Sequence, residues 1–525
     1  MTTGLIRLVN LIRHLTLTFG TLLIVSACTT LGPDYQKPEV PWLQEWHTDL
    51  YGQIKDPSEQ FEQDLEFWWH LFDDKVLNSL IETAKKENPT IQIAGLRILE
   101  SRAQLGIAGS TLYPQVQQLN GSANYINSED HGGISNDRHK SFANYSIGPS
   151  VTWELDFWGR FQRTIESADA AFFASIYNQQ DVQVLLIAQV ATLYYAYRTA
   201  LQSIQINREN AEIQKRNVEI TQLKYERGQD SELDLQQART QYYATLSVIP
   251  DIEISLVQIG NALAALLGRK PGDLPELDGI DGQLPAVEPI VIQELPAKLL
   301  MRRPDVRVSA AQVAVQSAQI GIAEADFYPS ISLLGTISYS GSTLDGTPDT
   351  SLLSAGSGFS WNIFDWGRIE NNVRLQDARL QQLIESFQDQ VLQAAREIDD
   401  AAISVIKTHE QKAIVQESLN SAQRSLEIAN KRYQEGYSSF QRVLDAQRAL
   451  LAQSNNELTN HSNHIDSVIS LYRAIAGGWT DTPIEEIIRE DTRETMKTRS
   501  DWGELMNAPL PTNIDYEPPQ QETSE

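Results

Sequence analysis

Residues 368–435 read RIENNVRLQDARLQQLIESFQDQVLQAAREIDDAAISVIKTHEQKAIVQESLNSAQRSLEIANKRYQE, 68 positions without a glycine or a proline. At about 1.5 Å per residue, one helix over this stretch would be roughly 100 Å long. Counting back from Tyr433 by four and three residues in turn meets apolar side chains down to Leu380, interrupted only at Thr408 and Lys412. A seven-residue repeat sustained this far is typical of helices that wrap against neighbours, as in coiled coils. We therefore expect a wall of long helices rather than a globular domain.

The same unit occurs twice in the chain. Residues 160–227 form a second run of 68 positions without glycine or proline, and short motifs around the two runs match at fixed offsets. The matching motifs are Tyr113-Pro114 with Tyr328-Pro329 at an offset of 215, and Trp153…Trp158-Gly159-Arg160 with Trp361…Trp366-Gly367-Arg368 at an offset of 208. We predict two tandem repeats over 88–268 and 303–478. Each contains one long helix and shorter helical pieces, such as 305–320 and 437–476 in the second copy.

Short segments between the helical runs have a different period. In 329–340 apolar residues alternate with small polar ones, and 114–125, 143–153 and 355–363 alternate in the same way, the first of them weakly. A two-residue period predicts β-strands. Four strands of about ten residues, apolar on one face and polar on the other, are typical of an outer-membrane barrel. A soluble sheet is the alternative. Because barrels of this kind start at about eight strands, the membrane interpretation requires the chain to oligomerise.

Four tryptophans lie at the predicted strand-to-helix junctions. They are Trp153, Trp158, Trp361 and Trp366. Indole rings collect at the interfaces between a membrane and water. We therefore expect these residues to form an aromatic belt at the membrane interface, whereas in a soluble sheet they would be core residues.

The amino-terminal end has the pattern of a secretory signal. Arg7 and Arg13 precede an apolar run from Leu15 to Val25, which is shorter than the roughly 20 residues of a membrane-spanning helix. The following Ser26-Ala27-Cys28 completes a sequence that resembles the bacterial lipobox, after which the cysteine begins the mature chain and carries lipid. We expect residues 1–27 to be a lipoprotein signal peptide and Cys28 to be lipidated. An ordinary signal peptide with an accidental cysteine is the alternative.

The composition excludes several functions. The formal net charge of −27 argues against a nucleic-acid partner, and the single cysteine excludes both a disulfide framework and a Cys-rich metal site. The sequence has no phosphate-binding glycine loop, nucleophile elbow or compact His/Cys cluster. We therefore expect no enzyme activity, no cofactor and no resident metal. His461 and His464 could share a metal, but we favour a solvated helix face for them. His131 and His139 fall in a polar insert between the first two strands.

Several motifs resemble those of one family of channels. They are Gly32-Pro33-Asp34-Tyr35 after Cys28, Trp68-Trp69, Asn88-Pro89, Tyr328-Pro329, Phe364-Asp365-Trp366-Gly367-Arg368, Leu444-Asp445-Ala446-Gln447-Arg448 and Gly477-Gly478-Trp479. In this order they resemble the outer-membrane efflux lipoproteins of the TolC/OprM (NodT) family. The resemblance implies an α+β membrane protein that forms a homotrimer. Each chain would lend four strands to one transmembrane β-barrel and its helices to a long α-helical periplasmic barrel.

The resemblance also implies a function and a location. The chain would be the outer-membrane channel component of a tripartite efflux pump, a passive exit duct for drugs or other small solutes that contributes to multidrug resistance. Its partners would be a periplasmic adaptor protein, an inner-membrane transporter of the RND type, and outer-membrane lipid around the anchor at Cys28. The alternatives are the exit duct of a type I protein secretion system, a metal-ion efflux channel, and a coiled-coil scaffold without a pore.

The helical ends far from the strands are the expected gate and docking surface. Gly228 and Gly436 follow the two long helices and predict the helix-tip turns at which an adaptor would dock. On three-fold symmetry one inward carboxylate becomes a ring of three. We expect the periplasmic gate to include Asp445 and Phe440, supported by Arg442, Asp234, Tyr225 and Tyr433. Solvated tip charges and seam aromatics are the alternative. Family members tend to have an apolar residue four positions before the aspartate, where this chain has Gln441.

The remaining segments lie outside the repeats. Residues 28–87 are proline-rich at first and helical from about Lys75, and we expect them to wrap the helices as an equatorial belt together with the linker 269–302. Residues 479–525 are acidic and poor in apolar periodicity. For this C-terminal tail we expect a short helix near 484–489, followed by a largely disordered segment.

Overall fold

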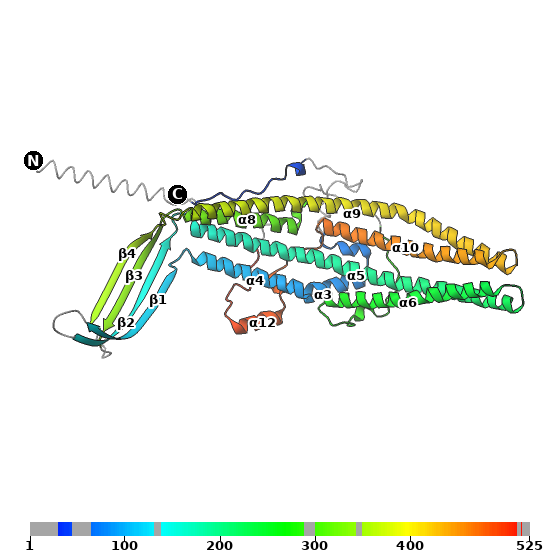
Figure 1. The fold of residues 1–525 in the computed structure, drawn as a ribbon, viewed down its shortest axis with the longest axis horizontal. Coiled ribbons are helices and arrows are strands. Elements are labelled where there is room, and N and C mark those ends of the chain that lie inside the picture. The colour runs from blue at the N-terminus through cyan, green and yellow to red at the C-terminus, as the bar shows by residue number, and fades with distance from the viewer. Residues whose placement is uncertain are drawn as a thin grey trace, which may run out of the picture.

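The computed structural model describes residues 30–44, 65–130, 138–287, 300–342, 349–511 and 516. Over these residues the protein is elongated, with a four-stranded sheet at one end and helices that run from it to the opposite end (Figure 1). The predicted signal peptide, the lipidation residue Cys28 and His131 lie outside the described residues.

Two long helices span the whole helical part. Helix α5 covers Arg160–Glu226 and α9 covers Arg368–Gln434, 67 residues each, which confirms the two runs predicted from the sequence. Shorter helices accompany them in the same order in both copies. Near the sheet these are α4 (Pro89–Ser110) and α8 (Pro304–Ala325), and near the far end α6 (Glu232–Leu266) and α10 (Phe440–Ala474) (Figure 1). The two short helices of a copy together nearly match its long helix, so both copies form one continuous wall.

Helix α8 is longer than predicted because it continues through Gly321. A Cβ atom added at Gly321 would lie 2.4 Å from the carbonyl oxygen of Leu31. This glycine therefore does not end the helix, and its missing side chain lets the N-terminal segment pass in contact with the helix backbone.

The heptad seam of α9 is its buried face. The buried seam residues are Phe387, Val391, Ala394, Ile398, Ala401, Val405, Val415, Ala422, Leu426 and Tyr433. The gap between Val405 and Val415 coincides with the two polar interruptions, and one of them, Thr408, contacts a histidine of α10 instead. Because each large aliphatic side chain buried in this way contributes roughly 1.5–3 kcal/mol, the seam holds the long helix to its neighbours.

The sheet joins the two copies. Strands β1 (Val116–Asp130), β2 (Arg138–Leu155), β3 (Ser330–Gly341) and β4 (Thr350–Ser360) pair antiparallel in sequence order. Each copy supplies one hairpin, and the β2–β3 ladder connects the two hairpins. The first hairpin is longer than predicted because the residues that pair at its end, 127–130 with 138–141, are all polar in the sequence and give no alternation to detect.

The two faces of the sheet differ in chemistry. On one face Trp153 lies opposite Leu333 and Ile147 lies opposite Tyr339. On the other face hydroxyl and amide groups of β1 and β2 hydrogen-bond across the ladder, with Ser122 and Ser146 2.8 Å apart. An apolar face toward lipid and a polar face toward a lumen are what a membrane barrel requires. The predicted texture of the strands is therefore confirmed.

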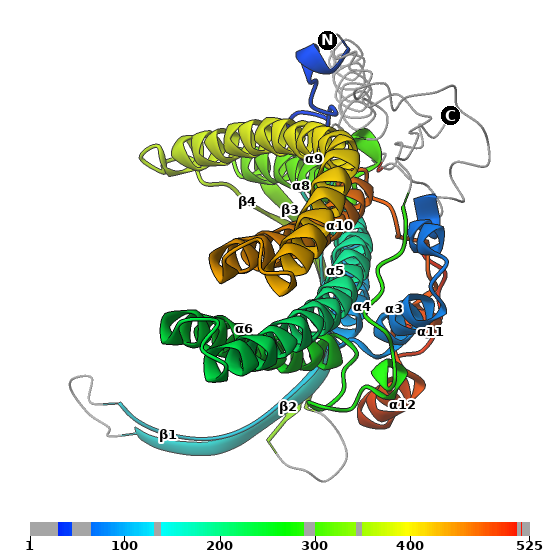
Figure 2. The ribbon, with the colours of Figure 1, turned by 90° about the vertical axis from the view of Figure 1, so that its right-hand side faces the viewer.

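Segments from both ends of the chain cover one side of the helical wall. Helix α3 (Lys75–Glu87) and the short helices α11 (Ile484–Ile487) and α12 (Glu490–Arg499) lie together on the convex side of the wall (Figure 2). Before α3, the 3₁₀ turn Trp68–Phe72 buries both of its tryptophans, and Trp68 stacks on Tyr472 of α10 with 5.1 Å between ring centroids. This buried aromatic cluster fixes the belt at the middle of the long helices.

Helices α5 and α6 each contain a stretch that could cross a membrane by length and composition alone. In α5 this apolarity is used for packing, because Leu186, Ile187, Val190, Tyr194 and Tyr195 are all buried among neighbouring segments. At roughly 100 Å, α5 is also far longer than the roughly 30 Å hydrocarbon layer. We therefore interpret both helices as parts of the wall.

Residues 480–511, which we call the C-terminal strap, are ordered and packed, so the expected disordered tail is wrong for this segment. The Arg102 guanidinium donates to the carbonyl oxygens of Leu505, Ala508 and Pro509 at 2.9, 2.7 and 2.9 Å. Ile488 and Met506 are fully buried. The strap follows the surface of α4 through hydrogen bonds and isolated apolar residues, which leave no periodic signal in the sequence.

We expect Arg102→Ala to release the strap from α4. Loss of a charged donor that satisfies three carbonyl groups should cost about 2–3 kcal/mol of local stability. Limited proteolysis of the folded protein should then show faster cleavage within 490–511. Arg97→Ala, on the exposed side of α4, is the matched control and should leave the cleavage rate unchanged. Equal cleavage of both variants would contradict the anchoring role of Arg102.

Candidate functional site

The two helical tips end in the turns that the glycines predict. Gly228 and Gly436 have φ values of 70° and 78°, in the left-handed region. At the first tip the amide of Gly228 donates to the carbonyl of Tyr225 at 2.9 Å, and the next amide donates to Lys224 at 2.8 Å. The second tip repeats both bonds at Gly436 and Tyr437. This is the Schellman arrangement, which satisfies the free carbonyls of a helix end.

Asp234 is part of a helix cap at the first tip. Its carboxylate accepts from the hydroxyl of Ser231 at 2.6 Å, and its own amide donates back to that hydroxyl at 3.2 Å. This capping box fixes the start of α6. In the second copy the corresponding Ser439 makes no such side-chain bond. Asp234 therefore has a structural role that the sequence interpretation as a gate residue did not include.

Tyr433 connects the two tips. Its ring is buried, its hydroxyl donates to the carboxylate of Asp230, and it lies 3.2 Å from the hydroxyl of Thr221. The Lys224 ammonium donates to the carbonyl of Tyr433 at 2.7 Å and lies 3.9 Å from the centre of its ring. Burial, followed by the bond to Asp230, raises the pKa of Tyr433, so the hydroxyl stays protonated and donates. We call these four residues, Tyr433, Asp230, Thr221 and Lys224, the tip latch.

Sequence reasoning named Tyr433 but missed Asp230, Thr221 and Lys224. The 208-residue offset places Tyr225 in the same position of the first copy, yet Tyr225 is 41% exposed. The repeat therefore could not indicate which of the two tyrosines makes the connection. The position related to Asp230 in the second copy is Ser438, so this acidic partner exists on one tip only.

Phe440 is placed differently from the expectation. It is 2% exposed and packs against Tyr433, with 5.5 Å between ring centroids, and against Val443 and Leu444. A side chain buried within one subunit cannot constrict a lumen directly, so the assignment of Phe440 as a constriction residue is wrong for this conformation. Its role is to pack the ring of Tyr433.

The other gate candidates are exposed. Asp445 accepts a hydrogen bond from the amide of Gln441 at 3.0 Å, and both lie on the surface of α10 near the tip with Arg442. Gln441 occupies the place where family members tend to have an apolar residue, and here it holds the carboxylate. The side chains of Asp445, Arg442 and Tyr225 are therefore exposed, whereas those of Tyr433 and Phe440 are buried within the subunit.

The four predicted interface tryptophans cluster at the base of the sheet. Trp153 and Trp361 make equivalent contacts in the two copies, donating their indole N–H groups to the carbonyl oxygens of Leu112 and Phe327 at 3.2 and 2.8 Å. Trp158 donates to the carbonyl of Pro329 at 2.9 Å. These contacts fix each strand end to a neighbouring helix end. Trp366 makes no comparable contact among the described residues and is 99% exposed.

The chain just after Cys28 runs along the base of the sheet. The amide of Leu31 donates to the carbonyl of Trp158 at 3.2 Å. The buried Arg163 guanidinium donates to Leu31 and to Gly32 at 2.9 and 3.1 Å, and pairs with Asp34 at 2.8 Å. The segment is therefore fixed beside one of the predicted membrane-interface tryptophans.

His464 does not lie on a solvated face. It is 4% exposed, with Nε2 3.2 Å from the carbonyl of Val287 and Nδ1 2.9 Å from the hydroxyl of Thr408. The nearby His461 donates from Nε2 to the carbonyl of Pro285 at 2.9 Å. Both histidines hold the linker that follows the first copy, and no group of metal-binding side chains forms among the described residues. Burial, and then the charges of His409, Lys412 and His461, lower the pKa of His464.

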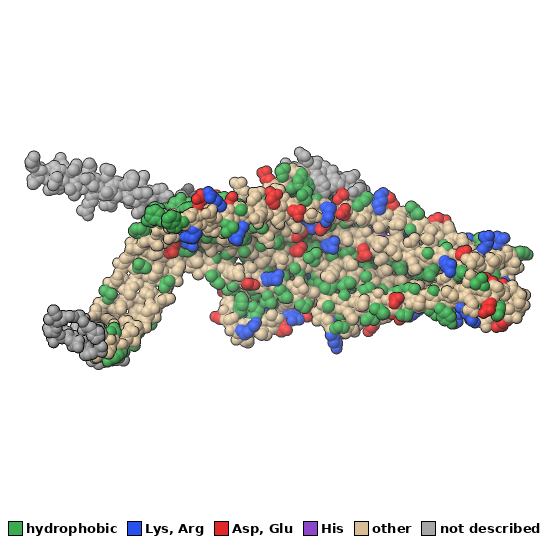
Figure 3. Space-filling model, viewed as in Figure 1, with side chains coloured by type: hydrophobic (Ala, Val, Ile, Leu, Met, Phe, Trp, Pro, Cys, Tyr) green, Lys and Arg blue, Asp and Glu red, His purple; other side chains and the backbone are tan. Residues whose placement is uncertain are grey.

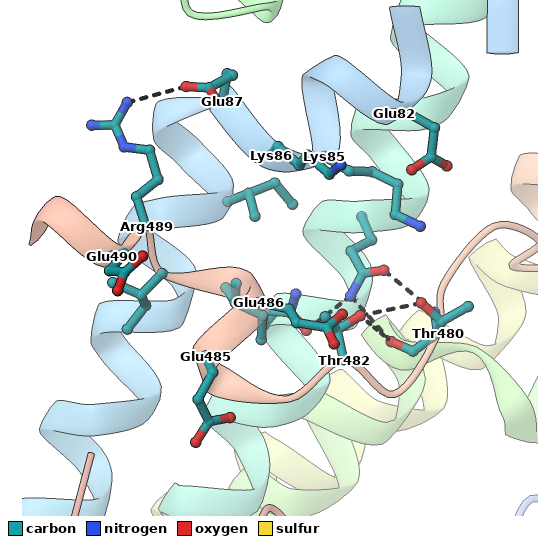
Figure 4. A pocket seen from close by; sticks show the side chains of 15 residues that line it. Glu82, Lys85, Lys86, Glu87, Thr480, Thr482, Glu485, Glu486, Arg489 and Glu490 are labelled. Carbon is teal, nitrogen blue, oxygen red and sulfur yellow. Dashed lines mark hydrogen bonds and ion pairs between the residues drawn. The ribbon is translucent and has the colours of Figure 1, made fainter. Parts of the chain in front are cut away.

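A cavity of about 660 Å³ lies between α3, α5 and the C-terminal strap (Figure 4). Its wall carries charges of both signs, with Lys85 and Lys86 on α3 opposite Glu485 and Glu486 of the strap. Arg489 at its edge pairs with Glu87 at 3.3 Å. The cavity belongs to the belt on the convex side of the wall, so it is not part of a path that runs along the helices.

Known proteins share this sequence and architecture. The family model described as "Outer membrane efflux protein" matches residues 80–269 and 295–477. The probable outer membrane lipoprotein SilC of Salmonella typhimurium is 29% identical over 474 residues, 89% of this chain and 99% of SilC. The cation efflux system protein CusC of Escherichia coli (strain K12) is 30% identical over 475 residues, 88% of this chain and 99% of CusC. The solved structure of the outer-membrane channel OprN has a TM-score of 0.79 and 28% identity, covering 86% of this chain and 100% of OprN.

The burial of His464 predicts a loss of stability in acid. Because its folded pKa lies below the unfolded value of about 6.5, the unfolded chain binds the proton more readily. The contribution of His464 is complete above about pH 6.5 and decreases as the pH falls below that value. Urea unfolding between pH 7.5 and 5 should show a smaller decrease for His464→Gln than for the unchanged protein.

The difference in pH-dependent stability between His464→Gln and the unchanged protein isolates this histidine from other titrating groups. Asp466 on the same helix has a pKa raised to about 6 by burial, and therefore changes stability in the opposite sense over this range. It is present in both proteins, so its effect cancels. Identical pH profiles for the two proteins would show that His464 is not the group responsible.

Proposed function

The chain belongs to the outer membrane efflux protein family, and from that premise we propose that it is the duct through which an efflux pump releases drugs or other small solutes. It is an outer-membrane channel component of such a pump, a trimer with its helical barrel in the periplasm. One observation carries the proposal. Two 67-residue helices and a four-stranded sheet with one apolar and one polar face occur together in a chain that matches whole family members from end to end.

The polar face of the sheet suits passive release. Most of its side chains are neutral hydroxyls and amides, with Glu154 and a few apolar residues such as Leu334 among them. Asn120 with Ser150, like Ser122 with Ser146, hydrogen-bond to each other. Such groups keep a lumen wet and bind a passing solute only weakly. Members of the family are channels, and we propose that this chain likewise provides a path without catalysing a reaction.

We propose that the tip latch holds the periplasmic end closed. The latch ties the α5–α6 hairpin to the α9–α10 hairpin within one subunit, at the end of the wall opposite the sheet (Figure 1). Opening requires the hairpins of neighbouring repeats to separate at this end, and the latch resists that movement. Asp445, Arg442 and Tyr225, exposed close by, are the residues that would meet a solute or another subunit.

The partners follow from the same function. Efflux across two membranes needs an energy source in the inner membrane, so we propose an inner-membrane transporter of the RND type and a periplasmic adaptor that docks at the turns of Gly228 and Gly436. We also propose that Cys28 carries lipid. Leu31, three residues later, is fixed at the base of the sheet by Trp158 and Arg163, where an acyl chain could enter the membrane.

Metal cations are a second candidate substrate. The observation that favours them is the similarity to CusC, a cation efflux system protein, over nearly its full length. Deletion of the gene should distinguish the candidates. Export of drugs predicts increased susceptibility to dyes, detergents and antibiotics, whereas export of cations predicts increased susceptibility to salts of metal cations. Loss of one secreted protein with unchanged susceptibility to all of these would contradict both and support protein secretion.

We expect Tyr433→Phe to increase leakage through the resting channel. The substitution keeps the packed ring and removes the bond to Asp230, which as a hydrogen bond to a charged acceptor contributes about 1.5–3 kcal/mol. If the bond exists only in the closed state, the ratio of closed to open channels should fall by about ten- to a hundredfold. Conductance of single trimers in a planar bilayer measures this ratio. Tyr243→Phe, at an exposed tyrosine of α6 outside the latch and the gate candidates, is the control and should leave it unchanged.

Asp445→Ala tests the predicted carboxylate ring separately. Removing three exposed carboxylates from one level of the tip should increase resting leakage several-fold if they bind cations or pair with arginine across the lumen. Glu417→Ala, an exposed carboxylate on α9 farther from the tip, serves as the matched charge control. Unchanged leakage in Asp445→Ala would remove this residue from the gate.

A further inference from the structure

One contact at the base of the sheet is complete in the first copy of the repeat and incomplete in the second. Trp158 of the first copy stacks on Tyr328 of the second, with 4.5 Å between ring centroids, and donates to the carbonyl of Pro329. The residues related to this pair by the repeat are Trp366 in the second copy and Tyr113 in the first. Both are exposed, by 99% and 69%. Trp366 and Tyr113 are therefore the repeat-related counterparts of a stacked pair, and both are left exposed in one subunit.

The backbone of Trp366 also indicates a missing partner. Its φ angle is +56°, a conformation that is costly for a bulky residue. Among the described residues of one subunit the exposed indole gains no contact that would offset this cost. Trp366 belongs to a run of exposed apolar residues after β4 that also includes Trp361, Ile363 and Phe364. A group of apolar side chains is visible at the sheet–helix junction (Figure 3).

The outer strands of the sheet also lack a partner on one side. Strands β1 and β4 are at the two edges of the sheet, so each has one side without a strand partner in the described chain. Open sheet edges do not occur within the hydrocarbon layer of a membrane. Phe359 on β4 is 78% exposed, while Gly121 on β1 has open space above it, because an added Cβ would meet only one atom, at 3.8 Å.

The internal repeat determines how these edges would pair. In the first hairpin Val116 pairs with Thr152, and in the second Ser330 pairs with Ser360. The repeat therefore relates β2 to β4 by an offset of 208 and β1 to β3 by an offset of 214. The β1-to-β3 offset is one less than the helix offset of 215 because the first copy has one extra residue, Gln115, between Pro114 and β1.

The existing β2–β3 ladder can then be carried over to the unpaired edges. It pairs Trp153 with Leu333 and Val151 with Gly335. Adding 208 to the first member and subtracting 214 from the second places Trp361 opposite Leu119 of the partner subunit, and Phe359 opposite Gly121 of the partner subunit. Each pair lies on the apolar face of both strands, so the faces of the sheet continue across the join.

We propose that Trp366 stacks on Tyr113 of the partner subunit and donates to the carbonyl of Pro114 of the partner subunit, and that β4 joins β1 of the partner subunit in this register. The inference rests on the trimeric barrel and adds the residues that close it. Three contacts of the Trp158 type within subunits then alternate with three of the Trp366 type between subunits around the base of the barrel. Phe359 covers the gap above Gly121 of the partner subunit.

Only part of the contact is repeated. In the first copy Arg160 also pairs with Asp326 at 3.4 Å, but the repeat-related residue of Asp326 is Thr111, which cannot form an ion pair. The join between subunits therefore depends on the aromatic pair and the strand ladder. Substitutions of Trp366 should consequently affect trimer stability more than substitutions of Trp158 do.

The register can be tested with a disulfide between subunits. It places Ser357 opposite Ala123 of the partner subunit, within the separation that a disulfide needs. Mild oxidation of trimers carrying Ser357→Cys and Ala123→Cys should give covalent dimers and trimers on non-reducing gels. Ser357→Cys with Leu119→Cys, displaced by four residues or about 13 Å, should give none. Ser357→Cys with Leu333→Cys, opposite each other within one subunit, shows that oxidation was complete. Cross-linking of the displaced pair, or none in the first pair, would overturn the register.

The aromatic contact can be tested with a double-mutant cycle. Trp366→Ala and Tyr113→Ala should each lower the temperature at which the trimer dissociates in detergent, and the double variant should lower it no further than the larger single effect. Independent, additive effects would overturn the contact and indicate that the two residues anchor the channel to lipid separately. Trp366→Phe should recover part of the loss, because a smaller ring still stacks. If the circular-dichroism spectrum of the released subunits matches that of the unchanged protein, misfolding is excluded as the cause of the lower dissociation temperature.

Discussion

Within the hydrocarbon layer of a membrane every backbone amide and carbonyl must be hydrogen-bonded inside the protein, and the architecture of this protein depends on that requirement. The part of the chain that the structure describes contributes the four strands β1–β4, and the two outer strands of this sheet have open edges. The sheet is therefore complete only when three chains close it. The strand ends continue directly into the long helices, β2 into α5 and β4 into α9. The closed sheet consequently also sets how far apart the long helices stand.

The internal repeat supplies both halves of this structure, and the two copies differ in their contacts at the helical tips and at the belt. Both tips have the same glycine turn, but only the first tip has Asp230 to accept a bond from Tyr433. Both copies have a proline-led helix, but Asn88 caps α4 with its side chain, whereas Arg303 binds Asp305 and Glu397 at 2.8 Å instead. Such differences make the contacts of the two hairpins of a subunit unequal.

Much of the fold could be predicted because its signals are local and long. The heptad seam from Leu380 to Tyr433 and the alternation in 329–340 depend only on which residues are apolar, and the structure has a helix and a strand there. The site was less predictable. Phe440 was expected in the lumen and is buried, since a sequence does not show which of several neighbours will cover an aromatic ring. His464 and the C-terminal strap were missed for a related reason. Their partners, Val287 and Arg102, are remote in sequence, and the hydrogen bonds that join them to His464 and to the strap follow no period.

The sequence by itself determined the two copies, the lengths of the helices, the alternating strands and the need for more than one chain, because each follows from periodicity and from the geometry of helix and strand. Only the tertiary structure decided which tyrosine forms the tip latch, which histidine is buried, where the strap lies and which tryptophan is left without a partner. These depend on side chains brought together across as many as about 400 positions. The repeat offers two equivalent residues for such a contact, one in each copy. Only packing in three dimensions selects one of them.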